Sequence, residues 1–177
     1  MRYVALLGSI NVGGNRLTMA DLRAAFSDAG FVGVATVGAS GNVIFGHDQA
    51  ADAVLETRVA KRIADVFGFD TFAAVRSREE LVAALAENPF VGVGADKLVH
   101  VGFLDGDIDE AAFARLVADH AGRGNEKLAP GTRALHIDYG EGVGDSKLTK
   151  AFIERRLGRR ITARNVSSIR RIIEKMG

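Results

Sequence analysis

The sequence YVALLGSINVGGN, Tyr3–Asn15, predicts how the fold begins. Its apolar run predicts a strand over Tyr3–Ile10, and a loop with two adjacent glycines follows at 11–15. A helix is expected from Thr18, which has the residue type of an N-cap. A strand that leads through a glycine loop to a helix N-terminus presents backbone N–H groups to an anion. The loop has neither the Walker pattern nor G-x-G-x-x-G, so a plain strand-to-helix connection is the alternative to an anion site.

The next elements continue an alternation of strands and helices. After the first helix, two short strands joined through 38–41 have the pattern of a hairpin. A second helix and a fourth strand complete a β-α-β-β-α-β order, which is the order of a ferredoxin-like unit. The expected ranges are strands 31–37, 42–45 and 71–75 and a helix over 49–67.

A similar order returns about ninety residues later, which predicts a tandem duplication. Ser77 and Glu80 predict a capped connector helix that ends at Asn88-Pro89. In the second half, only a short stretch near Arg160 and Ile161 stands where a fourth strand belongs, and a last helix follows. The fold class expected is therefore α+β, with two tandem ferredoxin-like halves, the second incomplete and ending in an extra helix. The expected domains are 1–76, a connector at 77–92, and 93–177.

The composition limits the class of protein. Its 177 residues are 47% hydrophobic and 25% charged, as in ordinary soluble globular proteins. The absence of cysteine excludes disulfides, thiolate zinc sites and cysteine nucleophiles. The sequence shows no signal-peptide pattern and no apolar run of about 18 residues. A cytoplasmic protein without a membrane partner is expected.

Charge is distributed unevenly along the chain. From Asp145 onward there are ten lysines and arginines and three acids, a net charge of +7. The rest of the chain has 13 basic and 19 acidic residues, a net charge of −6. Such asymmetry predicts either a phosphate-bearing partner or docking of the basic end on the acidic body.

Two motifs suggest metal sites, but neither supports a metal prediction. His100, His136 and Asp138 could meet if their two strands were neighbours, but polar residues on an open sheet face explain them better. The acidic run that begins at Asp105 lacks the glycine and the glutamate of a calcium loop, and helix capping by Asp107 explains it. No metal, cofactor or catalytic residue is predicted, and no serine-hydrolase elbow is present. Whether the protein is an enzyme is left open.

The basic tail has two alternative interpretations. Helices over 147–157 and 166–176 resemble a helix-turn-helix, in which Ser167, Ser168, Arg170 and Arg171 would face the DNA groove. Alternatively, Lys147, Arg164 and Asn165 hold a small anion, with the positive end of the last helix helping to bind it.

Seven blocks of sequence together resemble one family. They are the opening YVALLGSINVGG and the blocks MADL, SGNVIF, VRS, NPF, SKL and TARN, which begin at residues 3, 19, 40, 75, 88, 146 and 162. In this order they resemble a bacterial family catalogued as domain of unknown function 1697, whose members start with YVALLRGINVGG. The resemblance implies tandem ferredoxin-like halves and assigns no activity. Gly8 and Ser9 replace the family's Arg-Gly, and Val166 replaces a Trp, so an anion donor and a stacking surface are missing.

The sequence therefore predicts a protein that binds a small anionic or nucleotide-like ligand. A nucleic-acid-binding module that uses the basic C-terminal helices is one alternative, and a protein-interaction or structural role is another. The expected ligand-binding residues are Asn11, Gly13, Gly14, Asn15, Ser40, Gly41, Asn42, Lys147, Arg164 and Asn165.

Overall fold

The computed structural model describes residues 1–11, 14 and 16–177, and it divides the chain into two compact units. Unit 1 comprises Met1–Leu81 and Arg170–Gly177, and unit 2 comprises Val82–Ile169. The boundaries fall within helices α3 (Arg78–Glu87) and α6 (Val166–Met176). The domain limits expected from the sequence, 1–76, 77–92 and 93–177, stay a prediction about segments that fold independently.

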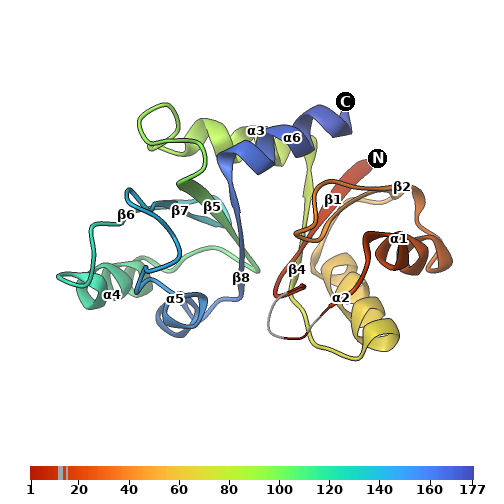
Figure 1. Cartoon of the computed structure of the whole chain (residues 1–177), viewed down its shortest axis with the longest axis horizontal. Helices are drawn as coiled ribbons and strands as arrows, with labels where there is room; N and C mark the ends of the chain where they lie inside the picture. The colour runs from red at the N-terminus through yellow and green to blue at the C-terminus, as the bar shows by residue number, and fades with distance from the viewer. Residues whose placement is uncertain (12–13, 15) are drawn as a thin grey trace. The chain divides into compact units, whose positions relative to one another are not determined.

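Unit 1 contains a four-stranded antiparallel sheet with the order β2-β3-β1-β4. Its central strand β1 is buried along nearly its whole length, as its continuous apolar sequence predicts. Helices α1 and α2 cover one face of this sheet (Figure 1). The elements are β1 (Arg2–Leu7), α1 (Met19–Asp28), β2 (Val32–Thr36), β3 (Asn42–Gly46), α2 (Ala53–Phe67) and β4 (Ala73–Ser77).

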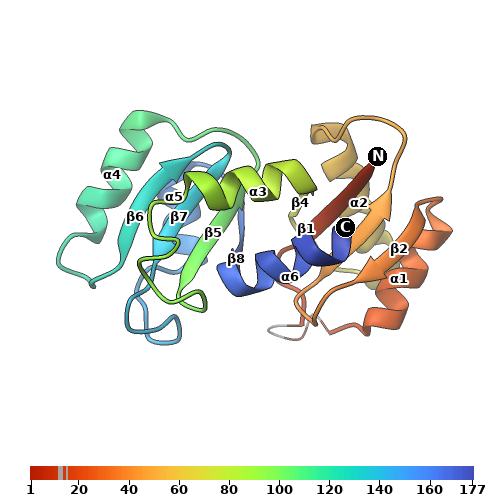
Figure 2. The same ribbon diagram turned by 90° about the horizontal axis from the view of Figure 1, so that it is seen from above.

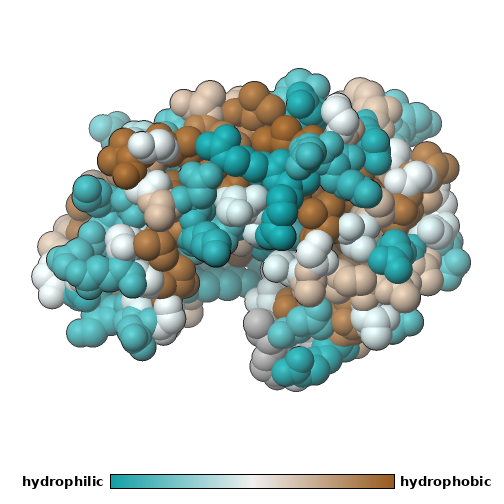
Figure 3. Space-filling model, turned by 45° about the horizontal axis from the view of Figure 1, so that its top comes forward, coloured by the Kyte–Doolittle hydropathy of each residue, from teal (hydrophilic) through white to brown (hydrophobic). Residues whose placement is uncertain are grey.

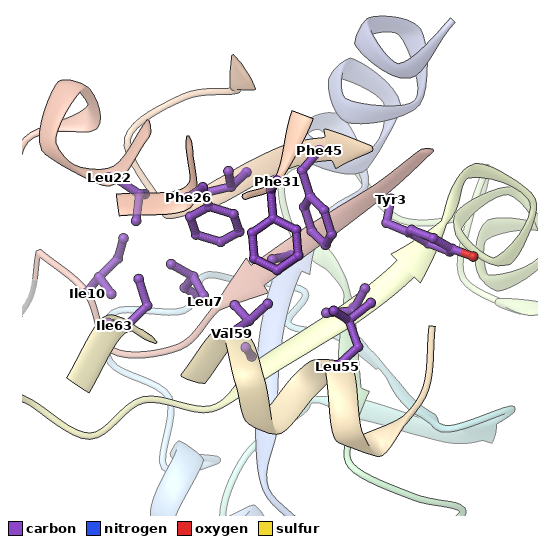
Figure 4. Close-up of a cluster of buried hydrophobic side chains, with 14 residues drawn as sticks. Tyr3, Leu7, Ile10, Leu22, Phe26, Phe31, Phe45, Leu55, Val59 and Ile63 are labelled. Carbon is purple, nitrogen blue, oxygen red and sulfur yellow. The ribbon is translucent and has the colours of Figure 1, made fainter. Parts of the chain in front are cut away.

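A group of aromatic rings fills the core between this sheet and its helices. Phe26, Phe31 and Phe45 lie side by side in Figure 4, with ring centroids 4.7–5.6 Å apart. Leu22 of α1 and Val59 of α2 are fully buried in the same cluster. The helical spacing of apolar residues in the sequence thus marks the faces that the helices bury.

Unit 2 contains a second four-stranded antiparallel sheet, with the order β6-β7-β5-β8. Figure 2 shows β6, β7 and β5 running side by side. Helices α4 and α5 cover one face of the sheet through Leu116 and Ile153 (Figure 1). The elements are β5 (Val99–Leu104), α4 (Glu110–His120), β6 (Lys127–Gly131), β7 (Ala134–Asp138), α5 (Lys150–Leu157) and β8 (Ile161–Asn165).

The structure confirms the α+β class and corrects the second half. Among the described residues, each unit has four strands, so the expectation of an incomplete second half is wrong. Strand β8 pairs with β5, opposing Ile161 to Leu104 and Asn165 to His100, and α6 follows β8 as α3 follows β4. Although only one of its five residues is exposed, β8 has the sequence ITARN with three polar residues, so it lacks the continuous apolar run by which β1 was recognised. Helix α5 also begins at Lys150 rather than at Lys147.

No helix among the described residues combines the length and apolar character that crossing a membrane requires. On the face shown in Figure 3, hydrophobic residues form several patches separated by hydrophilic ones.

Candidate ligand site

The structure brings together part of the site expected in unit 1. The Nδ2 of Asn11 donates a hydrogen bond to the carbonyl of Ala39 (3.1 Å), and its Oδ1 accepts one from the N–H of Leu17 (3.0 Å). Asn11 thereby joins the first loop to the hairpin turn that contains Ser40. Gly14 is exposed, with φ at 101°. Gly13 and Asn15 lie outside the described residues.

Packing accounts for Gly41 and Asn42 in this hairpin turn. Gly41 has φ at 79°, and a Cβ there would lie 2.3 Å from Cδ1 of Ile10, so the turn admits only glycine. Asn42 is buried and donates from Nδ2 to the carbonyl of Val37 (2.9 Å). Both residues hold the hairpin together, so their presence does not require a ligand.

Arg164 and Asn165 lie on the edge strand β8. The Nη1 of Arg164 donates to Thr162 Oγ1 and to the carbonyl of Ala163, both at 2.9 Å. Burial lowers the pKa of Arg164 to about 10, so the guanidinium is still charged at neutral pH. Asn165 Oδ1 accepts a hydrogen bond from the N–H of Ser168 (2.8 Å), which is the geometry of a helix N-cap.

Lys147 lies beside a cavity of about 340 Å³ in unit 2. The connection 123–126 between α4 and β6, Tyr139, and the loop residues 141–142 and 144–147 line this cavity. Strand β6 begins directly after this connection, whereas β8 is the opposite edge of the sheet. The structure therefore places Lys147 in a cavity and places Arg164 and Asn165 on the far edge strand.

The backbone on both sides of Lys147 is fixed. The Ser146 hydroxyl donates to Glu126 Oε1 at 2.5 Å and accepts from the N–H of Leu148 at 3.1 Å. The side chain of Leu148 is buried in the core of unit 2. Because its two neighbours are held in this way, the backbone of Lys147 has a defined position beside the cavity.

The carboxylate of Glu126 accepts the hydrogen bond that holds Ser146 in place, and the Glu126 side chain is only 8% exposed. His120 Nε2 lies 2.9 Å from its Oε2, so Nε2 carries the hydrogen and donates it, while Nδ1 is buried and has no partner. Burial alone would raise the pKa of Glu126. Hydrogen bonds from Ser146, its own backbone and His120 outweigh that effect, and the pKa lies below its ordinary value. Glu126 is therefore ionised at neutral pH.

Tyr139 adds a hydrogen-bond donor to the cavity wall. Its side chain is 8% exposed, and its ring packs edge-on against His100 with centroids 4.8 Å apart. Burial, with a smaller contribution from the charge of Glu126, raises the pKa of Tyr139 to about 12, so the phenol keeps its proton. Within the described part of the chain its hydroxyl makes no hydrogen bond.

Further donors of the loop also lack partners. The Lys147 ammonium forms no ion pair with any residue that the structure describes. The backbone N–H groups of Gly144, Asp145 and Lys147 make no hydrogen bond within the same residues. A cavity wall that combines a cation, a neutral hydroxyl and free N–H groups is suited to binding an anion.

Tyr139, Ser146 and Glu126 were not predicted from the sequence. The run from Tyr139 to Lys147, YGEGVGDSK, has three glycines at alternate positions ahead of Ser146-Lys147 and a helix, and this pattern was available as a signal. Nothing in the sequence around Glu126 marks it, because its role depends on contacts with His120 and Ser146.

Strand register keeps His100 away from His136, so the metal site that the sequence analysis set aside does not form, and the expected open sheet face is wrong for the buried His136. His100 opposes Ile137, and directly opposed residues project from the same face, so His136 projects from the other face. His136 is fully buried, and its Nε2 lies 3.2 Å from Glu87 Oε1. Burial lowers the pKa of His136, although Glu87 acts in the opposite direction.

The helix-turn-helix expectation is also wrong. Residues 158–165, expected to join two helices as a long turn, contain strand β8, which is paired with β5. A strand of a sheet between the two helices is incompatible with that DNA-binding motif.

Comparisons with known proteins agree with this fold. The family described as "Protein of unknown function (DUF1697)" matches residues 1–136. A solved structure of a conserved bacterial protein from Streptococcus pneumoniae is similar, with a TM-score of 0.74 and 22% identity over 99% of this chain and 98% of that one. At this identity the likeness concerns the fold alone. A search of the curated proteins found no match.

Proposed function

The chain belongs to the family of unknown function DUF1697, and from that premise we propose that it binds a small anionic ligand in the unit 2 cavity. The observation that carries the proposal is the set of unpartnered donors at one cavity wall: the Lys147 ammonium, the Tyr139 hydroxyl and the loop N–H groups. The volume of about 340 Å³ lies at the lower end of the range of about 300–1,000 Å³ for small-molecule sites. A ligand smaller than a dinucleotide fits such a site.

The proposal assigns different roles to the loop residues. Lys147 and the Tyr139 hydroxyl contact the anion directly. Ser146 and Glu126 act as positioning residues, since they fix the loop backbone on the N-terminal side of Lys147. Of the residues expected from the sequence, Lys147 is therefore the one on which this site depends.

A thermal-shift screen of phosphorylated metabolites, carboxylic acids and nucleotides tests the proposal. A ligand at about a hundred times its dissociation constant adds about 2.7 kcal/mol of stability, a shift of several degrees at this size. Lys147→Ala removes a charged hydrogen bond of about 1.5–3 kcal/mol and should weaken binding about 10- to 100-fold. Lys97→Ala is the matched control, because Lys97 is exposed and has no hydrogen bond within the described chain.

The same screen separates the alternative functions. A shift with DNA or RNA that salt abolishes would favour the nucleic-acid module, since counterion release makes such binding steeply salt-dependent. Retained small-ligand affinity in Lys147→Ala would contradict the proposed site. If no probe shifts the unfolding temperature, a protein-interaction role remains, and binding to an acidic partner protein would test it.

We infer that the halves are ferredoxin-like and arose by duplication. The strand order β2-β3-β1-β4 is repeated as β6-β7-β5-β8, and a helix follows directly after β4 and after β8. Arg76 of β4 and Arg164 of β8 both precede the last residue of their strand and donate from Nη1 to the preceding carbonyl at 2.9 Å. The expected cytoplasmic location stays a prediction, which cell fractionation tests.

A further inference from the structure

The charges around the unit 2 cavity indicate more than an anion. Its wall carries two cations, Arg123 and Lys147, together with three carboxylates, those of Glu126, Glu141 and Asp145. A purely anionic ligand would therefore be attracted by one part of the wall and repelled by another. A ligand with groups of both signs would satisfy both parts.

The carboxylates still have acceptor capacity for such a ligand. Glu141 and Asp145 are exposed and form no ion pair with any residue in the described ranges. A carboxylate has about four acceptor positions, and in Glu126 the groups of Ser146, His120 and its own backbone occupy three of them.

The cavity also contains hydrogen-bond donors that are separate from these carboxylates and from any helix end. The Tyr139 side chain is more than nine-tenths buried, lines the cavity, and has a hydroxyl without a hydrogen-bond partner among the described residues. The hydroxyl oxygen itself is not fully buried, so it is open to water or to a ligand that accepts its hydrogen bond. Tyr139 and Lys147 thus provide an anion subsite next to the acidic groups.

We infer that the ligand is a small zwitterion, with one phosphate or carboxylate group and one primary ammonium group. This inference rests on the proposed function, since it assigns the anion to Lys147 and the Tyr139 hydroxyl. The ammonium donates to Glu126 and to the loop carboxylates of Glu141 and Asp145. Both ends of the ligand are then paired with groups of opposite charge.

Matched probes test this inference by calorimetry at neutral pH, with phosphoethanolamine compared with ethyl phosphate, and β-alanine compared with propionate. In each pair the second compound lacks the amine and keeps the anion. We expect the amine-bearing probe of at least one pair to bind about tenfold more tightly or better. Equal or tighter binding of the amine-free anions would overturn the inference and leave the proposed function intact. No binding by any probe would overturn both.

Variants locate the two ends of the ligand. The double variant Glu141→Gln with Asp145→Asn should reduce the preference for the amine by about tenfold and leave the affinity for ethyl phosphate equal or higher. Lys147→Ala should weaken both members of a pair. Glu110→Gln is the control, because Glu110 is an exposed acid of α4 that does not line the cavity. Phosphate binding that requires added Mg²⁺ would overturn the inference, since the carboxylates would then hold a metal.

Discussion

Glu56 in unit 1 and Glu126 in unit 2 are equally buried carboxylates with different partners. Each side chain is 8% exposed. Glu56 Oε1 accepts from Arg76 Nη1 (2.7 Å) and from the N–H of Val75 (3.1 Å). Glu126 accepts from a serine hydroxyl and a histidine, and it lines a cavity.

The partners determine what each carboxylate does. Arginine stays charged at all working pH values, and the bond to Val75 joins α2 to the edge strand β4, so Glu56 has a structural role. Ser146 belongs to a loop whose glycines face open space, so its bond to Glu126 holds this loop beside the cavity. The comparison shows that burial of a carboxylate does not identify a site, whereas its partners and a neighbouring cavity do.

The largest effect is expected for Arg76→Ala, which leaves the Glu56 carboxylate without its cation. Removing one member of a buried ion pair costs about 3–5 kcal/mol. Urea unfolding at neutral pH measures the loss. Lys61→Ala is the control, because Lys61 and Asp65 form an exposed pair worth about 0.3–0.5 kcal/mol. Losses of similar size in both variants would contradict the structural role of Glu56.

A second comparison concerns the glycine loops of the two units. Gly41→Ala should lower the free energy of unfolding by about 2–3 kcal/mol. Alanine is strained at the positive φ of this position, and its Cβ would clash with Ile10. Gly38→Ala, with φ at 65° and no atom near its Cβ, should cost only about 1 kcal/mol. Gly144→Ala in unit 2 should leave stability within about 0.5 kcal/mol, since φ is not positive and the Cβ meets open space. Thermal unfolding of the three variants checks this order.

Glu126→Gln keeps the shape of the side chain and removes its charge. The hydrogen bonds from Ser146 and His120 weaken, and we expect a loss of about 1–2 kcal/mol at pH 7. The folded pKa of Glu126 lies below its ordinary value of 4.5, so its charge stabilises the fold above pH 4.5. That stabilisation is lost as the pH falls through the folded value.

Urea midpoints from pH 7 to pH 3 test this prediction. The difference between the native chain and Glu126→Gln should be largest at neutral pH and should shrink below pH 4.5. A constant difference across this range would show that the charge of Glu126 does not hold the loop.

An effect smaller than that of Glu126→Gln is expected for His100→Phe, which keeps a ring against Tyr139. Burial lowers the pKa of His100 from 6.5 to about 4, so the unfolded chain takes up a proton that the folded chain rejects. The native chain should therefore lose stability as pH falls from 6.5 toward 4. Between pH 6.5 and 5, the variant His100→Phe should lose less stability than the native chain. The difference should be below about 1 kcal/mol, because the His100 ring is partly exposed and solvent reduces the effect of its charge. An unchanged pH slope in the variant would contradict the lowered pKa.

Much of the fold could be predicted from local sequence. Apolar runs and cap residues indicate strands and helix ends that depend on residues close by in the chain. The Ser77–Glu80 pair forms the expected reciprocal cap, with bonds of 2.7 and 3.1 Å, and Thr18 caps α1. Strand β8 was missed because an edge strand that carries Arg164 and Thr162 lacks the alternation or apolar run used for recognition.

The sequence by itself determined the α+β class, the central strand β1 and the caps formed by Thr18 and by Ser77 with Glu80, because these depend on neighbouring residues in the chain. The cap expected at Asp107 was wrong, since Asp109 caps α4. Only the tertiary structure decided that Glu126 holds Ser146, twenty residues away, and that His100 and His136 lie on opposite faces. Such contacts depend on strand register and on which segments the fold brings together. Register is set by pairing across the whole sheet, so a local pattern can point to the glycine loop before Lys147 but not to the contacts that complete its cavity.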